Sequence, residues 1–345
     1  MKVITISEPG KLKIQDANRP SVGPYQALVK TEKVALCNST DSKLLSGKFP
    51  GVDKYPLVLG HEGCGIVEVI GEKVQNFRLG DRVIGGLNFD FSDINHESGW
   101  GGFAEYVLVN DHDAMVEDGV NNAENGWFEV YEVQRKVDKS ISIDDAVLIC
   151  TWREVLGAFG DFNLVAGNKV LIYGAGPVGL SFVKFGKLIG LEWIGVVDPL
   201  PEKRKKAIEL GADEVFDPAI NEHILYAENH PETMDFVIDA VGIPAIINES
   251  LPMIRMGGSV CVYGVISDNE FTINKSKAPY NFNLYIHQWP TRWREKEAQV
   301  TLTQWIKEGK LSASEFVTHS FPASQVEKAF EEVKKGNVIK CLLSF

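Results

Sequence analysis

The sequence has 345 residues, of which 44% are hydrophobic and 24% charged, so the chain is long enough for two globular domains with separate cores. Its formal net charge of −12 argues against a nucleic-acid partner, because a phosphate backbone would repel so acidic a surface. No apolar run reaches the roughly 20 residues of a membrane span, no signal-peptide pattern is present, and the five cysteines are scattered, so we expect a cytoplasmic protein without membrane attachment.

The N-terminal part of the chain reads as a series of short β-strands. The expected strands are Lys2–Ile6, Lys11–Ile14, Ala27–Val34, Gly65–Val69 and Arg82–Ile84. Between them, the sequence CNSTD at residues 37–41 interrupts the alternation with side chains that can coordinate a metal or form hydrogen bonds. The sequence GHEG follows at residues 60–63. These two polar stretches are the candidates for chemistry in this part of the chain.

Residues 111–150 are acidic and irregular. The sequences Asn121-Asn122 and Glu124-Asn125-Gly126 are turn signals, so we expect a surface loop or a hairpin here. The sequence SIDDA at residues 142–146 then has the N-cap and the acidic first turn of a helix that leads to Cys150.

The stretch from Val170 to Asp198 contains the fingerprint of a dinucleotide-binding fold. Its first residues, Val170–Tyr173, form an apolar run short enough for a buried strand. Three glycines follow in G-x-G-x-x-G spacing, at Gly174, Gly176 and Gly179. A helix is predicted from Pro177 to about Ile189 with Gly190 as its C-cap, and a second apolar run ends in Asp198.

Each part of this fingerprint has a physical reason. Gly174 permits a tight turn, Gly176 lets the backbone approach a pyrophosphate, and Gly179 lets the helix pack closely on the strand. The helix N-terminus attracts phosphates through its free N–H groups and partial positive charge. Asp198 can accept hydrogen bonds from the adenosine ribose, which favours NAD over NADP. The basic cluster Arg204–Lys206 is more typical of a solvated helix face than of a site for a 2′-phosphate.

Beyond Asp198, strands and helices alternate, which predicts a doubly wound parallel sheet. The expected elements are the strands Glu214–Phe216, Phe236–Ile238 and Val260–Tyr263, the helices Glu202–Leu210 and Ala245–Arg255, and an amphipathic helix within residues 322–336. The segments Asp239–Gly242 and Tyr263–Val265 follow strands, at the sheet edge where open α/β folds bind ligands. The aromatic side chains of residues 280–293 favour core or interface packing over a substrate cleft.

The chain resembles the zinc-dependent medium-chain alcohol and polyol dehydrogenases. The resemblance is carried by GHEGCGIVEVIGEKVQNFRLGDRV from Gly60, GGFAEYVLV from Gly101 and GAGPVG from Gly174, in the order and spacing of that family. It implies an α/β plus β architecture, in which residues 1–152 and 288–345 form a GroES-like catalytic domain. A Rossmann domain, residues 153–287, would be inserted between them, and the protein would be a homodimer or a homotetramer.

By the same resemblance, Cys37 and His61 are the first two ligands of a catalytic zinc. The third ligand stays open between Glu62 and Cys150, which falls where alcohol dehydrogenases place a second cysteine. Ligands scattered along the chain suit a catalytic site, which keeps one position for water or substrate. The cysteine-rich lobe of many members is replaced by GLNFDFSDINHESGW at residues 86–100, so we expect one zinc per chain and no structural zinc.

The resemblance also implies roles for residues around the metal and the cofactor. Asp41 would accept the second ring N–H of His61. Thr40 or Ser39 would take the proton of the substrate alcohol, and Lys43 stands where some members carry a relay histidine. The residues expected to contact NAD are Gly174, Gly176, Pro177, Val178, Gly179, Asp198, Lys203, Val241, Gly242, Gly264 and Val265.

The implied reaction is hydride transfer between NAD and a secondary alcohol. Polar residues near the metal motif, and the lack of structural-zinc cysteines, favour a polyol, a cyclitol or a sugar as the substrate. The alternatives are a zinc-free quinone or enoyl reductase of the same superfamily and a non-catalytic nucleotide-binding sensor. Both are disfavoured because Cys37 and His61 are present.

Overall fold

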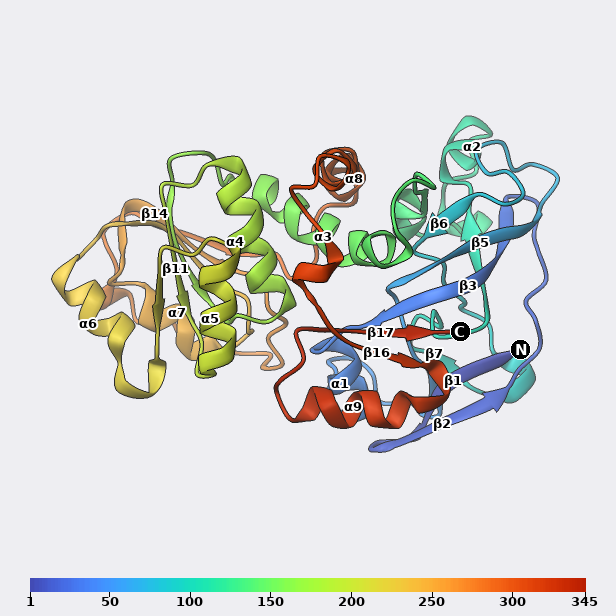
Figure 1. Cartoon of the computed structure of the whole chain (residues 1–345), viewed down its shortest axis with the longest axis horizontal. Helices are drawn as coiled ribbons and strands as arrows, with labels where there is room; N and C mark the ends of the chain where they lie inside the picture. Colours follow the sequence, from blue (N-terminus) through green and yellow to red (C-terminus); the bar gives the residue numbers. More distant parts are fainter. The chain divides into compact units, whose positions relative to one another are not determined.

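The computed structural model describes all 345 residues as two compact units (Figure 1). Unit 1 consists of Met1–Arg153 and Glu295–Phe345, and unit 2 is the continuous segment Glu154–Arg294. The chain passes between the units within two long helices, α3 (Ile143–Phe162) and α8 (Arg292–Lys307). None of the helices combines the length and the apolar character needed to cross a bilayer.

Unit 1 is built from two β-sheets. The smaller has the strand order β2-β1-β4-β7, and the larger has the order β16-β17-β3-β5-β6-β9, with β8 paired to β3. The strands are β1 (Lys2–Glu8), β2 (Lys11–Asp16), β3 (Gln26–Leu36), β4 (Leu57–Val58), β5 (Gly63–Ile70), β6 (Arg82–Ile84), β7 (Glu97–Ser98), β8 (Tyr106–Asn110), β9 (Arg135–Lys136), β16 (Val317–Pro322) and β17 (Lys340–Ser344). Both ends of the chain belong to this unit because β17 pairs antiparallel with β3, with Leu342 opposite Ala35.

A helix near the C-terminus completes the core of unit 1. Helix α9 (Val326–Lys334) runs beside β16 and buries Val326, Ala329 and Phe330 against the sheet residues (Figure 1). The amphipathic helix expected here is therefore confirmed, although it begins at Val326 after a 3-10 turn. The 3-10 turns of the chain are Ser92–Ile94, Ala123–Asn125, Glu129–Val133, Pro218–Ile220, Lys275–Lys277, Ala313–Glu315 and Ala323–Gln325.

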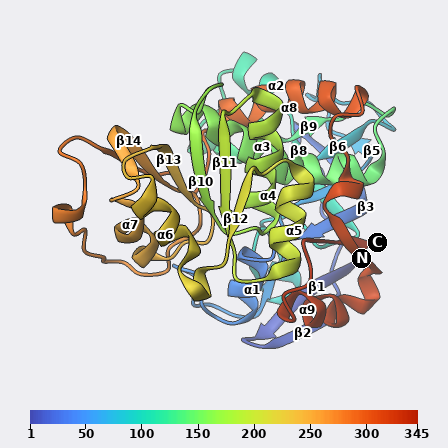
Figure 2. The same ribbon diagram turned by 60° about the vertical axis from the view of Figure 1, so that its left-hand side comes forward.

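Unit 2 is a parallel sheet with the strand order β12-β11-β10-β13-β14-β15. Its strands are β10 (Lys169–Tyr173), β11 (Trp193–Val197), β12 (Glu214–Phe216), β13 (Met234–Asp239), β14 (Ile254–Val262) and β15 (Asn283–Ile286). Helices α4 (Pro177–Ile189) and α5 (Pro201–Leu210) cover one face, and α6 (Glu222–Asn229) and α7 (Pro244–Ser250) cover the other (Figure 2). The doubly wound sheet is thus confirmed, and its strand order reverses between β10 and β13, where such folds bind ligands.

The helix predicted at Ala245–Arg255 is wrong at its C-terminal end. Helix α7 stops at Ser250, and Ile254 already belongs to β14, where it pairs with Met234. The intervening turn buries apolar side chains on the same core as the helix and the strand. Because a continuous apolar run fits a buried helix and a buried strand equally well, periodicity could not locate this boundary.

The acidic segment expected as a surface loop or hairpin contains an exposed loop at residues 121–126, and the residues on both sides of this loop are folded onto unit 1. Asp111 caps helix α2 (His112–Glu117), and its carboxylate also accepts the backbone N–H groups of Gln75 and Asn76. Further along, Tyr131 is buried within a 3-10 turn. The hairpin is therefore wrong, because side-chain hydrogen bonds rather than strand pairing hold the segment in place.

The aromatic residues between 280 and 293 do not share one core. Tyr280 is 90% exposed, and Trp289 and Trp293 are 40% and 46% exposed. Tyr285 and His287 contact each other, with ring centroids 5.8 Å apart. Of the expected core or interface packing, the core part therefore holds for only some of these residues, and interface packing of the exposed ones stays a prediction.

A buried ion pair connects α3 with α8 inside unit 1. Arg153 Nε lies 3.1 Å from Glu295 Oε1, and the guanidinium also donates to the Val133 carbonyl. The two side chains are 5% and 0% exposed. Removing one partner would leave the other as an uncompensated charge in the core, which costs more than the intact pair contributes.

Replacing Arg153 by methionine should therefore lower the free energy of unfolding by about 3–5 kcal/mol, as measured by urea denaturation. The matched control is Lys2→Met, which breaks an exposed pair with Asp16 and should cost less than about 1 kcal/mol. The double variant R153M/E295L should regain most of the loss. If R153M loses no more free energy of unfolding than Lys2→Met does, then an uncompensated Glu295 charge does not destabilise the core.

Candidate functional site

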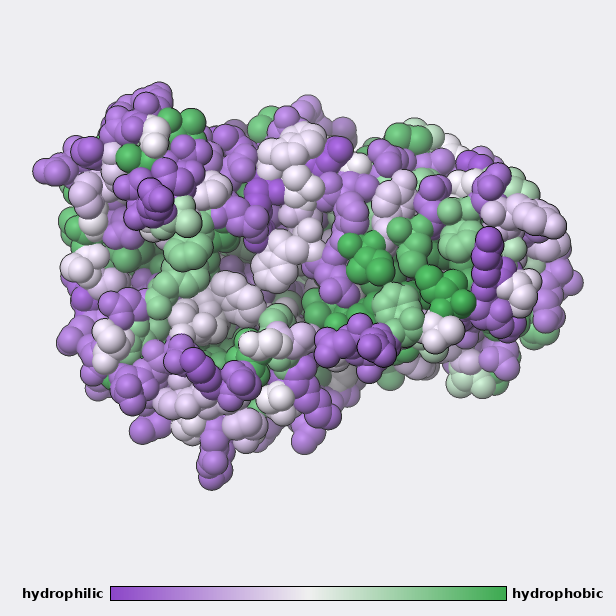
Figure 3. Space-filling view, turned by 180° about the vertical axis from the view of Figure 1, so that it is seen from behind, coloured by the Kyte–Doolittle hydropathy of each residue, from purple (hydrophilic) through white to green (hydrophobic).

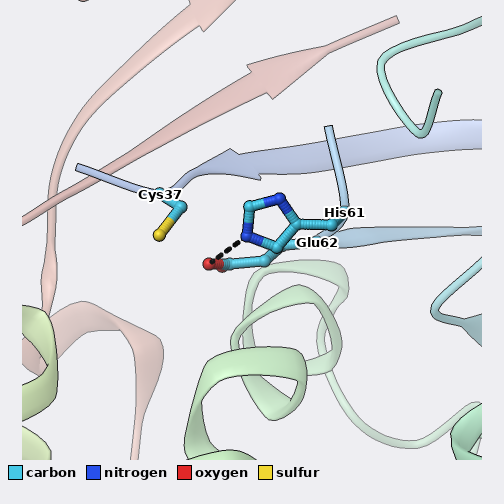
Figure 4. Close-up of side chains that lie close together, drawn as sticks. All are labelled: Cys37, His61 and Glu62. Atoms are coloured by element: carbon cyan, nitrogen blue, oxygen red, sulfur yellow. Dashed lines mark ion pairs between the residues drawn. The ribbon is translucent and has the colours of Figure 1, made fainter. Parts of the chain in front are cut away.

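Cys37, His61 and Glu62 bring their donor atoms together in unit 1 (Figure 4). Cys37 follows the end of β3, and the other two residues precede β5. The strands are paired, with Val34 opposite Gly63, so the end of one lies beside the start of the other. The thiol sulfur, one imidazole nitrogen and one carboxylate oxygen all lie within 4.8 Å of one another.

The chemistry of this group fits a zinc ion. Thiolate, imidazole and carboxylate are the ligand types of zinc sites, and bond lengths of about 2.0–2.3 Å place tetrahedral ligand atoms roughly 3.5 Å apart. His61 Nε2 lies 3.8 Å from Glu62 Oε1. Two buried atoms nearby, His61 Nδ1 and Asp41 Oδ1, have no hydrogen-bond partner and lie 3.8 Å apart. An imidazole that binds a metal through Nε2 directs its Nδ1–H toward such a carboxylate, which is the role expected for Asp41.

Two buried side chains that the sequence analysis missed hold Glu62. Lys340 Nζ lies 2.6 Å from Glu62 Oε2, and Thr151 Oγ1 donates to the same oxygen at 2.7 Å. Lys340 comes from β17 and Thr151 from α3, so the contact joins three distant parts of the chain. The available signal was the single cation in the apolar run VIKCLL, because a lysine is almost never fully buried without a partner.

The charges of this network keep the Glu62 carboxylate ionised. Burial alone would raise the pKa of Glu62, but the Lys340 ammonium, His61 and the two hydrogen bonds hold that pKa below its usual value. Burial would lower the pKa of Lys340, and the Glu62 carboxylate outweighs it and raises that pKa. Asp41 differs, because burial raises its pKa to about 7. Of the two carboxyl groups, Glu62 is therefore the one prepared to act as an anionic ligand at neutral pH.

Cys150 lies outside the group of three. Its buried Sγ donates to the Gly63 carbonyl oxygen, 3.8 Å away. The next residue, Thr151, is the one that contacts Glu62. The structure thus brings Glu62 to Cys37 and His61, and it does not bring Cys150 there.

Helix α1 (Thr40–Leu45) carries the residues expected to move a proton. Thr40 is buried at its first position, whereas Ser39 is exposed before it. Asp41 anchors this turn, because its Oδ2 accepts the Cys37 N–H at 2.9 Å. Lys43, three residues after Thr40, is half-buried on the same short helix.

In unit 2, the glycine-rich turn joins β10 to α4. Gly174 has a φ of 95°, and a Cβ on Gly179 would lie 1.8 Å from the Gly174 carbonyl oxygen, so the turn itself requires both glycines. Gly176 differs, because its φ is −76° and a Cβ there would meet nothing within 4 Å. Pro177 and Val178 follow in the first turn of α4. The fold does not need a glycine at 176, but a phosphate approaching the backbone would.

Asp198 lies beside this turn and is almost fully buried. Its Oδ2 accepts the Ala175 N–H at 2.7 Å, and its Oδ1 accepts the Leu200 N–H at 2.9 Å. Arg204 is held by neighbouring acceptors: it donates to the Asp198 carbonyl and pairs with Asp217 Oδ2 at 2.9 Å. Lys203, on the same helix, is half-buried. The arginine of the basic cluster is thus already paired with an acid.

The remaining expected cofactor residues lie in two turns after β13 and β14. Asp239 accepts the N–H groups of Val241 and Gly242, each at 2.8 Å. A Cβ on Gly242 would lie 2.5 Å from the Val265 carbonyl oxygen, and one on Gly264 would lie 2.2 Å from the Gly242 nitrogen. These glycines therefore have a packing reason that is independent of any cofactor.

Two family models match the chain. Residues 23–117 match the alcohol dehydrogenase GroES-like domain, and residues 177–288 match the zinc-binding dehydrogenase model. Among its relatives, L-idonate 5-dehydrogenase of Vitis vinifera is 26% identical over 96% of this chain and 92% of its own length. D-arabinitol dehydrogenase 1 of Uromyces fabae is 24% identical over 99% of this chain and 96% of its own length.

Solved structures share the fold over the full chain. A protein of Escherichia coli CFT073 described as a short chain alcohol dehydrogenase, rspB, was solved with NADH and gives a TM-score of 0.80 at 22% identity, with 100% of this chain and 99% of that chain covered. A zinc-binding dehydrogenase of Sinorhizobium meliloti 1021, bound to NADP, gives a TM-score of 0.81 at 22% identity with the same coverage. At this level of identity, the likeness establishes the fold alone.

Proposed function

The chain belongs to the medium-chain alcohol and polyol dehydrogenase family, and on that premise we propose that it oxidises a secondary alcohol by transferring a hydride to NAD with the help of zinc. The observation that carries the proposal is the convergence of Cys37, His61 and Glu62 in unit 1. The glycine turn between β10 and α4 in unit 2 supports the part of the proposal that concerns NAD. The relatives named for L-idonate and D-arabinitol support a polyhydroxy compound as the substrate, and within that class the proposal covers a polyol, a cyclitol or a sugar.

We propose that Cys37, His61 and Glu62 are the protein ligands of a single zinc ion, and that Cys150 is not a ligand. Lys340 and Thr151 both bind Oε2 of Glu62, which leaves Oε1 on the side of His61. A carboxylate held in this way needs no rotation to reach a metal beside the imidazole. When bound, zinc would supply Lewis-acid polarisation of the substrate hydroxyl and lower its pKa.

We propose Thr40, rather than Ser39, as the residue that takes the proton of the alcohol. Thr40 is buried next to Asp41, which fixes the turn, whereas Ser39 faces solvent. Lys43 follows Thr40 by three residues, and residues at that spacing share a helix face. Lys43 is therefore the group placed to pass the proton toward solvent.

NAD is the cofactor that the residues of unit 2 favour over NADP. The Asp198 carboxylate lies beside the glycine turn, where it can bind ribose hydroxyls and would repel a 2′-phosphate. Arg204, the nearest candidate for binding such a phosphate, is paired with Asp217. We expect kcat/KM for NAD to exceed that for NADP by about tenfold or more, the effect of one hydrogen bond to a charged group.

The purified protein should reduce NAD in the presence of polyols, cyclitols or aldoses, and a metal chelator should abolish that turnover. The measurement is NADH absorbance across a substrate panel, before and after chelation and after zinc is added back. Turnover that resists the chelator would point to a zinc-free reductase instead. Binding of NAD without turnover of any substrate would point to a nucleotide-binding sensor.

We also propose a homo-oligomer, either a dimer or a tetramer. Strand β15 is the last in the sheet of unit 2, so its outer backbone edge has no strand partner. Ile286 on this strand is 46% exposed, and Met256 on β14 is 48% exposed. Figure 3, which shows the opposite face from Figure 1, has a group of apolar side chains in green on its right-hand part, which belongs to unit 2. Open sheet edges with apolar side chains are commonly covered by another chain.

A further inference from the structure

Trp100 lies beside the metal-binding group and has an unusual backbone conformation. Its φ is 69°, in the left-handed region that bulky residues rarely adopt. Strain of this kind persists only where the surroundings fix it, and it clusters at functional sites. The indole placed in this way lies against the imidazole of His61, with ring centroids 5.4 Å apart and planes inclined by 60°.

The backbone around Trp100 fixes this placement. The Trp100 carbonyl accepts the Asn88 N–H at 3.1 Å, and the Gly102 N–H donates to the Gly60 carbonyl at 2.7 Å. A Cβ on Gly101 would lie 2.3 Å from the Asn88 carbonyl oxygen, and one on Gly102 would lie 2.7 Å from the Gly60 carbonyl oxygen. The loop therefore packs closely against the segment that carries His61, and this packing fixes the position of the Trp100 backbone.

The metal-binding group is closed on its polar side. Asp41, Thr151 and Lys340, which surround the ligands there, are 0%, 5% and 2% exposed. Trp100 contacts His61, and Phe49 contacts Trp100 with ring centroids 5.5 Å apart; both aromatic side chains are half-buried and pack against the core of unit 1. A substrate whose hydroxyl binds beside His61 would therefore bring its carbon skeleton near this partly exposed indole.

We propose that Trp100 determines substrate specificity by stacking on the C–H face of a cyclic polyhydroxy substrate, a cyclitol or a pyranose. Such a ring carries hydroxyl groups around its rim and C–H groups on its faces, so a flat apolar wall complements the face while the metal binds a rim hydroxyl. An open-chain alditol has no comparable face. The inference rests on the proposed function, because it names the substrate class of the same metal site.

The test compares kcat/KM of the wild type, Trp100→Ala and Trp100→Phe for three substrates. These are a ring substrate, the open-chain alditol with the same number of carbons, and a small acyclic secondary alcohol. Trp100→Ala should lose about tenfold on the ring substrate, the value of an aromatic stacking contact, and less than about threefold on the small alcohol. Trp100→Phe keeps a flat ring and should recover most of the loss. Melting temperature and zinc content separate this role from one in positioning His61.

A second measurement needs no turnover. In saturation-transfer NMR without NAD, the C–H protons of one face of the ring substrate should receive saturation from the wild type and lose it in Trp100→Ala. Equal losses of kcat/KM on all three substrates, or no loss on any, would overturn the inference and leave the proposed function intact. A wild type that turns over nothing would overturn the proposed function, while the NMR contact still decides whether Trp100 binds the ring.

Discussion

Replacing His61 by alanine should remove zinc from the protein and lower kcat/KM by roughly 1,000-fold or more, because the Lewis acid supplies several kcal/mol and about 1.4 kcal/mol changes a rate tenfold. The imidazole is one of three protein ligands in the proposed set, so Cys37 and Glu62 alone would hold the ion. The measurements are zinc content per chain by elemental mass spectrometry and the rate of NADH formation. A variant that keeps its zinc would contradict the role of His61.

Two further variants identify the third ligand. Cys150→Ala removes a buried thiol outside the group and should keep both zinc and activity. Glu62→Gln keeps the size of the side chain but removes its charge, and should lose zinc. Since Lys340 would then be a buried cation without its anion, Glu62→Gln should also lower the free energy of unfolding by about 3–5 kcal/mol. If Cys150→Ala loses its zinc and Glu62→Gln keeps it, then Cys150 rather than Glu62 is the third ligand.

Replacing Gly179 by alanine should abolish NAD binding and destabilise unit 2, whereas replacing Gly176 by alanine should weaken NAD binding alone. At Gly179 the new Cβ would lie 1.8 Å from the Gly174 carbonyl oxygen, so the turn must open. At Gly176 the new Cβ would meet nothing within 4 Å and the backbone is one that alanine adopts freely. The added methyl group there enters only the space through which a pyrophosphate approaches the backbone.

Calorimetry separates the two effects, because it gives both the Kd of NAD and the melting temperature. Gly176→Ala should raise the Kd by about 10- to 100-fold, the cost of losing a hydrogen bond to a charged group, at an unchanged melting temperature. Gly179→Ala should lower the melting temperature as well. If Gly176→Ala binds NAD as tightly as the wild type, then the pyrophosphate of NAD does not bind at this turn.

The Rossmann half of the fold, unit 2, was predictable because its signals are local. The glycine turn, the capping glycine of α4 and the acid after β11 all lie within one strand–helix–strand unit. The error at Arg255 arose where the signal is not local. Strand β14 is extended because Ile254 pairs with Met234, 20 residues away in the sequence, and no pattern within the strand reports that pairing.

The proposed metal site was predictable only in part. Cys37 and His61 follow from the family motifs, but the sequence left Glu62 and Cys150 as equal candidates for the third ligand. What distinguishes them is the pair of contacts that Lys340 and Thr151 make with Glu62, and these depend on where β17 and α3 lie. Trp100 escaped prediction for another reason. Its importance lies in a backbone angle and a ring contact, neither of which leaves a periodic pattern in the sequence.

The pairing of β17 with β3 also sets the order in which the chain can mature during synthesis. Unit 2 is one continuous segment, so it can fold while the second part of unit 1 is still being translated. Lys340, by contrast, leaves the ribosome after every other residue of the proposed metal site. Until it arrives, Glu62 lacks the cation that makes its burial tolerable, so the nascent chain should complete unit 2 first and form the proposed metal site last.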